Sequence, residues 1–300
     1  MGALPKLSVI FLSYTINDGI WQMNCQAIDS LIQSEAWDND GLEIILIESS
    51  KTSPYRYPEF VRVLVPEERF NFHRFFNIGL DNSSGDFIAF CNNDIIFEGG
   101  WYSAMMKVKK DHPRFMCFSP LDDKYPGMAP ASLPRDKEFY CGWDYGKYFA
   151  PWCFVWERKV FKTIGRFDEV FDFYAADADE TNTLRYYAIP SVVVTNSVVR
   201  HLSSQTVSKE RTINDHRITD YKQYPLTEAE LKRGYQWLWD DDRFYWGYQR
   251  EKAKWGNIQM TKRVQTLLQK FPFLNIRPIA KLLYNRRTNH FLCRLTGIKE

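Results

Sequence analysis

The alternation of short apolar runs with amphipathic stretches over the first 95 residues is the feature that most constrains this fold. Each apolar run has the length and composition of a strand that is buried on both faces. The stretches between them place apolar residues at helical spacing. The predicted strands are Leu7–Ser13, Glu43–Ile47, Val61–Val65 and Asp86–Cys91, and the predicted helices are Trp21–Gln33 and Phe70–Leu80. Strands alternating with helices favour an α/β fold with a mixed, mostly parallel sheet.

The second half of the chain is less regular. Asp122–Lys147 is rich in Pro and Gly and is predicted to be a long loop beside a binding site. From about residue 205 the sequence becomes polar and helical. The predicted elements are the strands Trp152–Trp156, Ser191–Thr195 and Ser197–His201, and the helices Lys159–Ile164, Phe173–Tyr187, Leu226–Trp239 and Tyr245–Lys270. We therefore expect two parts, an α/β domain over residues 1–205 and a helical, basic extension over residues 206–300.

Charge is unevenly distributed along the chain. The whole sequence has a formal net charge of +2, but Glu251–Glu300 contains 11 Lys and Arg against 2 Asp and Glu. Such a basic end suggests peripheral contact with an anionic membrane surface, and the alternative is a solvated helical cap. Binding of nucleic acid is not expected, because no sequence motif supports it.

The spacing of the cysteines and the hydropathy of the sequence indicate the cellular compartment. None of the six cysteines forms a Cys-x-x-Cys pair, so neither a zinc ribbon nor a redox motif is indicated. The sequence shows no signal peptide and no apolar run near the roughly 20 residues that a membrane span requires. A reducing, cytoplasmic location is the expectation.

Polar residues follow three of the predicted strands: Tyr14, Glu48 and the run Asn92-Asn93-Asp94. Ligands of parallel α/β sheets bind at the carboxyl ends of the strands. A carboxylate such as that of Asp94 can ligate Mg²⁺ or Mn²⁺, with diphosphate oxygens and water completing the coordination. The alternative is a polar turn after a strand.

An acidic cluster precedes and enters the predicted helix Phe173–Tyr187. Six acids lie between Phe167 and Glu180, and Asp177 and Asp179 are two positions apart, so their side chains point in different directions. One of them is a candidate general base for an acceptor hydroxyl, and the other can cap the helix. A solvated acidic helix start is the alternative.

Three cationic or imidazole side chains are further candidates. His201, which ends a predicted strand, can supply a metal ligand or bind a phosphate. His73 and Arg74 can pair with a diphosphate. Each of these has a structural alternative.

The order of these features resembles the GT-A glycosyltransferases, in particular the inverting family 2. The resemblance covers about residues 7–205. Its motifs are the opening strand Ser8–Tyr14, the loop Ile47–Ser50, Asn77-Ile-Gly, the run Ser84–Asp94 into the metal motif, and Phe154–Glu169 before Ala176-Asp177. Three positions depart from the family pattern: Glu48 and Asn92 each replace an Asp, and Ala176 replaces a Glu. The resemblance implies a Rossmann-like nucleotide-diphospho-sugar transferase fold.

The resemblance also implies a role for each candidate residue. Tyr14 and Glu48 would contact the base or ribose of a UDP- or dTDP-sugar, Asn92 the ribose or a water, and Asp94 the metal, with His201 assisting. Asp177 would be the general base, with Asp179 as the alternative. Further donor contacts are expected from Asn93 and Arg74, and acceptor contacts from Asp179, Trp143, Trp152 and Trp156, although these tryptophans suit a core equally well.

The implied activity is transfer of a hexosyl or deoxyhexosyl group, with inversion, to a hydroxyl of a glycan, such as a lipid-linked cell-surface polysaccharide. Two alternatives remain at this stage. One is a non-catalytic carbohydrate-binding or scaffold protein that retains the fold, which the departures at Asn92 and Ala176 keep open. The other is a sugar nucleotidyltransferase. Such an enzyme would need a Gly-rich phosphate loop after the first strand, and Ser13–Gly19 does not have one.

Overall fold

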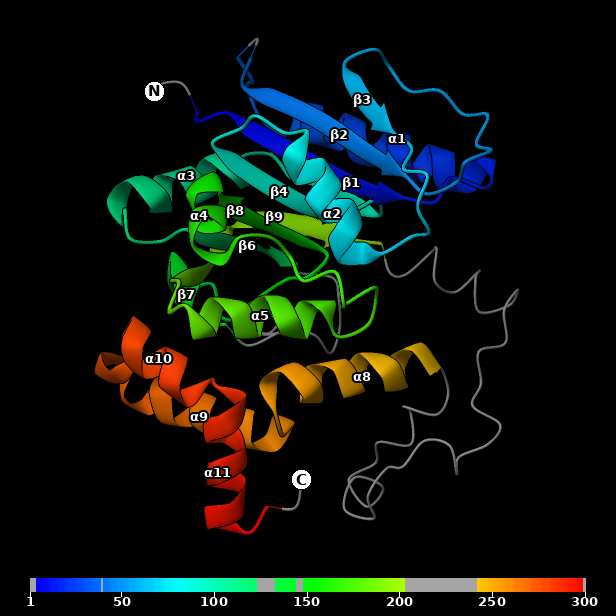
Figure 1. Cartoon of the computed structure of the whole chain (residues 1–300). Helices are drawn as coiled ribbons and strands as arrows, with labels where there is room; N and C mark the ends of the chain where they lie inside the picture. Colours follow the sequence, from blue (N-terminus) through cyan, green and yellow to red (C-terminus); the bar gives the residue numbers. More distant parts are fainter. Residues whose placement is uncertain (1–3, 39, 123–132, 144–147, 203–241, 299–300) are drawn as a thin grey trace. The chain divides into compact units, whose positions relative to one another are not determined.

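Figure 1 shows a computed structural model of the chain, which describes residues 4–38, 40–122, 133–143, 148–202 and 242–298. The backbone divides into two compact units. The first comprises Met1–Phe167 and Ile189–Ser208, and the second comprises Asp168–Ala188 and Lys209–Glu300. The domain boundary expected between residues 205 and 206 lies outside the described residues, as does the predicted helix Leu226–Trp239. The structure adds the short segment Asp168–Ala188 to the unit of the C-terminal helices.

A single sheet forms the centre of the first unit (Figure 1). Its order within the described residues is β3-β2-β1-β4-β8-β6-β9-β5, with β7 paired to β9. The first four strands of this order are parallel, whereas β8 runs antiparallel to both β4 and β6. The strands are β1 (Leu7–Ser13), β2 (Leu42–Glu48), β3 (Val61–Leu64), β4 (Phe87–Asn92), β5 (Ile95–Phe97), β6 (Cys117–Asp122), β7 (Phe139–Cys141), β8 (Cys153–Glu157) and β9 (Ser191–His201).

Helices cover both faces of this sheet. The connection β1–α1–β2, with α1 (Asp18–Gln33), and the connection β3–α2–β4, with α2 (Phe72–Asp81), lead in opposite directions along the sheet. Because such crossovers are right-handed, the two helices pack on opposite faces, as Figure 1 shows. Alternate residues of each strand therefore face different helices. The remaining helical elements of this unit are α3 (Trp101–Asp111), the short 3₁₀ turn η1 (Arg158–Val160) and α4 (Phe161–Ile164).

The two faces have different cores. Ala27 and Leu31 of α1 and Met105 of α3 belong to one cluster with alternate residues of β1, β2 and β4. On the other face, Phe76 of α2 packs edge-on against Phe90 of β4, in a cluster of aromatic rings. Burial of apolar side chains on both faces explains why the strands appear in the sequence as continuous apolar runs.

The second unit is helical in its described residues. It consists of α5 (Ala176–Tyr186), α8 (Asp242–Trp255), α9 (Ile258–Lys270), the 3₁₀ turn η4 (Pro272–Leu274), α10 (Arg277–Leu283) and α11 (Arg286–Thr296). Its apolar cluster is small and is built on Val264, Leu268, Ala280 and Tyr284. No helix in the described part of the chain is long and apolar enough to cross a membrane. All six cysteines are free thiols.

The predicted α/β fold class with a mostly parallel sheet is confirmed, and several details differ. The strand β6 and the helix α3 were not predicted. The predicted strands Ser191–Thr195 and Ser197–His201 are one strand, β9, and β7 lies within the predicted loop Asp122–Lys147. The short strand β5 was not predicted. The predicted helix Tyr245–Lys270 is two helices, because Gly256 adopts a φ of +87° and the Asn257 side chain accepts hydrogen bonds from the first turn of α9.

Candidate functional site

The side chains of Asp94 and His201 are in contact just beyond the end of β4. Nε2 of His201 is 3.1 Å from Oδ1 of Asp94, and both side chains are buried. Two backbone features create this contact. Ile95 pairs with His201 in the antiparallel β5–β9 ladder, and the backbone N–H of Leu202 donates to the carbonyl of Asp94 at 2.8 Å. The sheet itself therefore brings together two residues that are 107 positions apart in the sequence.

Trp152 contacts the ring of His201, and Asp122 contacts its backbone N–H. The rings of Trp152 and His201 are stacked, with centroids 5.1 Å apart and planes inclined by 8°. Trp152 is itself tied to the end of β4, because its carbonyl accepts a hydrogen bond from the N–H of Asn92 at 2.9 Å. Oδ2 of Asp122, which is fully buried at the end of β6, accepts the backbone N–H of His201 at 3.3 Å. The imidazole is thus oriented by its surroundings on the protein side.

Asn24 of α1 is the centre of a buried hydrogen-bond network beside this pair. Its Nδ2 lies 2.8 Å from Oγ of Ser13, 2.9 Å from Oγ1 of Thr15 and 2.7 Å from the hydroxyl of Tyr57. Its Oδ1 accepts a hydrogen bond from Nδ2 of Asn93 at 2.7 Å. The network therefore joins the loop after β1 to the Asn-Asn-Asp turn after β4.

Glu48 ends β2 and is 2% exposed. Its Oε1 accepts two backbone hydrogen bonds, from Thr15 at 2.9 Å and from Ser50 at 2.7 Å, which join the loops after β1 and β2. Within the described part of the chain, Oε2 is buried and has no hydrogen-bond partner. A buried carboxylate oxygen in this state is unfavourable unless a ligand or water supplies a donor.

The other predicted residues of the first unit occupy varied positions. Tyr14 and Asn92 are half-buried after β1 and at the end of β4, and Arg74 is half-buried in the first turn of α2. Nε1 of Trp143 donates to the carbonyl of Ile189 at 2.6 Å, which anchors this half-buried indole. Trp156 does not fit an acceptor role: it is fully buried and packs among phenylalanine rings of the core, so a sugar cannot reach it.

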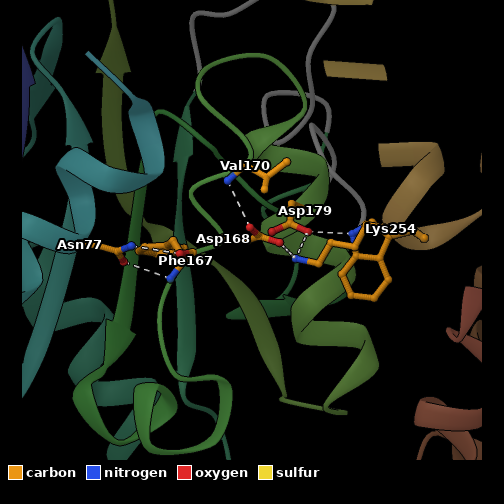
Figure 2. A network of polar contacts seen from close by, with 7 residues as sticks. Asn77, Phe167, Asp168, Val170, Asp179 and Lys254 are labelled. Atoms are coloured by element: carbon orange, nitrogen blue, oxygen red, sulfur yellow. Dashed lines mark hydrogen bonds and ion pairs between the residues drawn. The ribbon is translucent and has the colours of Figure 1, made fainter. Parts of the chain in front are cut away.

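The two candidate bases on α5 have different surroundings. Asp179 is buried, and its Oδ1 lies 2.7 Å from Nε1 of Trp255 and 2.7 Å from Nζ of Lys254, both on α8 (Figure 2). The same ammonium group lies 2.8 Å from Oδ2 of Asp168. These contacts give Asp179 a structural role in place of the predicted acceptor contact. Asp177 is half-buried, and its Oδ1 accepts the backbone N–H of Ala178.

Two further acids of the second unit have perturbed titration. Burial raises the pKa of the Glu180 carboxyl well above its ordinary value, and the charges of Asp177 and Asp179 raise it further. Burial and the charge of Asp177 raise the pKa of Glu251 on α8 to about 7, against the opposing effect of Lys262 and Arg185. Asp177 therefore belongs to a cluster of carboxyl groups within which ionisation of one disfavours ionisation of the next.

Asp94 and His201 are the residues best suited to hold a divalent metal ion. A carboxylate oxygen and an imidazole nitrogen are both ligands that Mn²⁺ accepts. In the described residues no group of three or more His, Cys, Asp or Glu side chains is arranged to hold a metal. Among the described residues, Asp94 and His201 would supply two ligands. The residue types fit a metal that binds together with its substrate.

Several members of this site were not predicted. Asn24 occupies the apolar stripe of α1, at helical spacing from Ile20, Ala27 and Leu31, and a polar side chain in such a stripe is a detectable signal. Asp122 falls at the end of a strand that was not predicted, so its position carried no such signal. Lys254 and Trp255 contact Asp179 across 75 or more positions of sequence, which no local pattern reveals.

Comparison with known proteins agrees with the fold. The model of the family described as glycosyl transferase family 2 matches residues 15–164, which is half of the 300-residue chain. The structure of GalNAc-T7 with UDP, GalNAc and Mn²⁺ is similar with a TM-score of 0.51 and 17% identity, over 82% of this chain and 56% of that chain. S. aureus TarS 1-349 is similar with a TM-score of 0.51 and 12% identity, over 92% of this chain and 90% of that chain.

These likenesses differ in what they establish. At such low identity the two solved structures show a common fold, and the chain spans little more than half of the GalNAc-T7 chain. No curated protein sequence matches the chain. The predicted GT-A glycosyltransferase fold is confirmed by the family match and by both structures.

Proposed function

Because the chain belongs to glycosyl transferase family 2, we propose that it transfers a hexosyl or deoxyhexosyl group from a nucleoside diphosphate donor to a glycan hydroxyl, with inversion at the anomeric carbon. The observation that supports this most strongly is the buried Asp94–His201 pair, fixed by Trp152 at the carboxyl edge of β4. Ligand sites of α/β sheets lie at this edge.

Asp94 and His201 would hold Mn²⁺ or Mg²⁺. When bound there, the metal neutralises the negative charge that develops on the leaving diphosphate. GalNAc-T7, which shares the fold, was crystallised with UDP and Mn²⁺. The stacked indole of Trp152 and the backbone contact of His201 with Asp122 orient the imidazole before any ligand arrives. Orientation of a metal ligand by its neighbours raises affinity for the metal.

The donor nucleotide would bind at the ends of β1, β2 and β4. Oε2 of Glu48 would accept a hydrogen bond from the base or the ribose, and this role is supported by the burial of that oxygen without a hydrogen-bond partner among the described residues. Tyr14 would lie against the nucleotide, Asn92 and Asn93 would bind ribose or water, and Arg74 would pair with the diphosphate. The donor is a UDP- or dTDP-sugar.

Asp177 is the proposed general base. It takes the proton of the acceptor hydroxyl as that oxygen attacks the anomeric carbon, and the bond from this carbon to the diphosphate breaks at the same time. We prefer Asp177 to Asp179 because the carboxylate of Asp179 is buried against Lys254 and Trp255. Trp143 is the remaining candidate for aromatic contact with the acceptor sugar, because Trp152 is 4% exposed and its ring stacks on His201. The proposed acceptor is a glycan of a cell-surface polysaccharide, made on the cytoplasmic side of the membrane.

A donor panel tests this proposal. The purified chain is incubated with nucleotide sugars and Mn²⁺, with or without EDTA and with glycan acceptors, and released nucleoside diphosphate is measured. Release from one donor that EDTA abolishes is the expected result, and it also identifies the sugar. If no donor is turned over and calorimetry detects no nucleotide binding, the non-catalytic carbohydrate-binding alternative replaces this proposal.

The metal assignment is tested with Asp94→Asn. We expect the variant to lose at least about 100-fold in metal-dependent release, because an amide is a weaker ligand for a hard cation than a carboxylate. Asp86→Asn is the matched control, since Asp86 is exposed just before the same strand. Equal activity of the two variants would refute the metal role of Asp94.

A further inference from the structure

The three C-terminal helices lie in a stretch of chain with an extreme charge composition. Between Ile258 and Ile298 the sequence has eight Lys and Arg residues and no Asp or Glu. The same stretch holds a large share of the exposed large hydrophobic side chains in the described residues: Leu267, Phe271, Phe273, Ile276, Leu282, Phe291 and Leu295. Cationic and exposed apolar side chains are therefore found together.

The outer face of α9 combines both kinds of side chain. Its inner face is formed by Met260, Val264 and Leu268, which are buried. The exposed positions Arg263, Leu267 and Lys270 follow at intervals of four and three residues, which places them on one side of the helix, and Phe271 is the exposed residue directly after its end. Leu267 is 43% exposed and Phe271 is 44% exposed.

The outer face of α11 repeats this arrangement. Its inner face is formed by Asn289 and Cys293, which are buried. The exposed positions Arg287, Phe291, Arg294 and Leu295 follow at the same intervals of four, three and one residues. Phe291 is 58% exposed and Leu295 is 67% exposed. Two helices thus present the same order of cation, apolar group, cation and apolar group.

Such a face differs from the polar outer face of an ordinary helix in a globular protein. Large apolar side chains in contact with water carry a cost that a partner surface can remove. The cationic side chains limit the kind of partner, because they require a surface that is anionic where the apolar groups enter it. The headgroup region of an anionic bilayer has both properties, since phosphates lie directly above the acyl chains.

We propose that the outer faces of α9 and α11, defined by these eight residues, bind the surface of an anionic lipid bilayer. The leucine and phenylalanine side chains enter the boundary between headgroups and acyl chains, and the Lys and Arg side chains pair with lipid phosphates above them. A nucleic acid would use the same cations, but it would leave Leu267 and Leu295 exposed to water. An anionic lipid surface therefore accounts for both the cationic and the exposed apolar side chains.

Co-sedimentation of the full-length chain with vesicles tests this inference. One set of vesicles is phosphatidylcholine alone, and the other contains about one third phosphatidylglycerol. We expect binding to the anionic vesicles, a steep decrease of this binding as NaCl is raised, and negligible binding to phosphatidylcholine. Equal binding to both kinds of vesicle, or no binding to either, would overturn the proposal. The readout is independent of sugar transfer, so it stands whether or not the proposed activity is found.

Paired variants separate the two contributions. Arg287→Gln with Arg294→Gln is expected to lower the vesicle partition coefficient about 30-fold, and Phe291→Ser with Leu295→Ser at least about tenfold. The corresponding α9 pairs are Arg263→Gln with Lys270→Gln and Leu267→Ser with Phe271→Ser. The matched charge control is Arg69→Gln with Lys110→Gln, two exposed cations of the first unit, and it should change binding less than about threefold.

Three results would overturn the assignment to lipid. The first is vesicle binding that is unchanged in both pairs of apolar-to-serine variants. Because the substituted side chains are exposed, these variants are expected to fold, so a decrease in binding would report on the lipid contact itself. The second is binding of a single-stranded RNA oligonucleotide that is stronger than vesicle binding and insensitive to the apolar pairs. The third is a dimer in light scattering that Phe291→Ser with Leu295→Ser dissociates, which would make the face an interface between two copies of the chain.

Discussion

At the scale of single residues, the candidate site depends on polar side chains that are held inside apolar packing. Asn24 makes four side-chain contacts from the buried face of α1, and each partner belongs to a segment next to the site. A buried amide with all its partners present costs little, whereas its removal leaves several polar atoms without one. Asn24 therefore determines the shape of the turn that ends in Asp94.

Replacement of Asn24 tests this role. Asn24→Leu keeps the branched shape of the side chain but removes the partner of Asn93, Thr15 and Ser13, and we expect a loss of about 2–4 kcal/mol in the free energy of unfolding. The matched control Gln26→Leu, at an exposed position of the same helix, should change it by less than about 0.5 kcal/mol. Urea denaturation measures both. Equal stability of the two variants would show that the network is dispensable.

Asp177→Asn tests the general base. We expect the turnover number of transfer to fall about 10²–10⁴-fold, because the amide cannot accept the proton of the acceptor hydroxyl. The affinity for nucleoside diphosphate, measured by calorimetry, should not change. Full transfer activity in this variant would exclude Asp177, and Asp86→Asn again controls for the loss of one negative charge.

The sequence predicts those site residues that lie at the ends of strands, and it does not predict contacts between residues that are distant in the sequence. Glu48, Asp94 and His201 were identified because each ends or follows a strand, and the carboxyl ends of strands form the edge of a sheet. Trp152 was selected as an acceptor contact, and in the structure its ring stacks on His201 of β9. The sequence could not indicate that Trp152 and Trp156 are both buried, because tryptophan also suits an exposed sugar-binding surface.

At the scale of elements, helix α8 contacts the segment that leads into α5 along most of its length. The ring of Phe244 stacks on Tyr174, Arg250 pairs with Asp172, and Lys254 joins Asp168 to Asp179 (Figure 2). Asp177 lies within the segment so held. The helices after residue 241 therefore have a defined task in the second unit, which is to fix the first turn of α5.

Lys254 is the residue at which to test this task. Lys254→Met removes the ammonium group that lies 2.7 Å from the buried carboxylate of Asp179. We expect a loss of about 1–3 kcal/mol in the free energy of unfolding, which is less than for a fully buried pair because Lys254 is partly exposed. Lys254→Arg should recover most of it. In transfer assays the turnover number should fall for Lys254→Met while nucleotide affinity is retained. Lys270→Met is the control, and equal stability of the two methionine variants would contradict the role of Lys254.

Glu251, one turn before Trp255 on α8, gives the second unit a pH dependence. Its pKa is about 7 in the folded chain, against an ordinary value of 4.5. The folded chain thus binds this proton more tightly, so the contribution of Glu251 to stability is fully present below pH 4.5 and is lost as the pH rises from 4.5 to 7. Burial of the Glu251 carboxyl is the largest cause of the raised pKa, to which the charges of Asp177 and Asp179 add and which those of Lys262 and Arg185 oppose.

Glu251→Gln should therefore stabilise the chain at high pH. We expect a gain on the order of 3 kcal/mol in the free energy of unfolding at pH 8, which shrinks as the pH falls to 5, because glutamine does not ionise. Urea denaturation of wild type and variant at both pH values measures it. Glu59→Gln, at an exposed position, is the control. A gain of the same size at pH 5 and pH 8 would contradict the raised pKa.

Element boundaries show what local sequence patterns can and cannot predict. The strands β1, β2 and β4 were predicted almost to the residue, because burial on both faces makes each one a nearly continuous apolar run. The edge strand β3 was predicted from its β-branched residues Val61 and Val63, although Arg62 and Val63 are exposed. The strand β5 has three residues and exists through its pairing with β9, so its own sequence is too short to indicate it. The division between α8 and α9 was signalled by Gly256, but helical spacing of apolar residues continues across it.

At the scale of the whole molecule, the two compact units do not follow the order of the sequence. Residues 168–188 lie between two segments of the first unit, yet they pack with the C-terminal helices. Cooperative units of structure commonly coincide with such packing units. The chain therefore leaves the first unit, enters the second, returns through β9 and leaves again.

Native-state hydrogen exchange in increasing urea tests this division. Peptides from α5 are expected to lose protection at the same urea concentration as peptides from α8 and α9, and at a different concentration from peptides of β1 and β4. The comparison needs no variant and no substrate. Loss of protection in α5 together with β1 and β4 would show that α5 depends on the sheet instead of on the C-terminal helices.

The interleaving of the two units also limits how such a gene can be recombined or shortened. A chain that ended after β9 would keep every strand of the sheet, but α5 would lose Lys254 and Trp255, to which Asp179 is bonded. In a chimaera with a related enzyme, residues 168–188 and the helices after residue 241 would have to be exchanged together, through two separate crossovers. The proposed base Asp177 would travel with them, while Asp94 and His201 would stay with the recipient. Natural variation in these enzymes is thus expected to change both segments in concert.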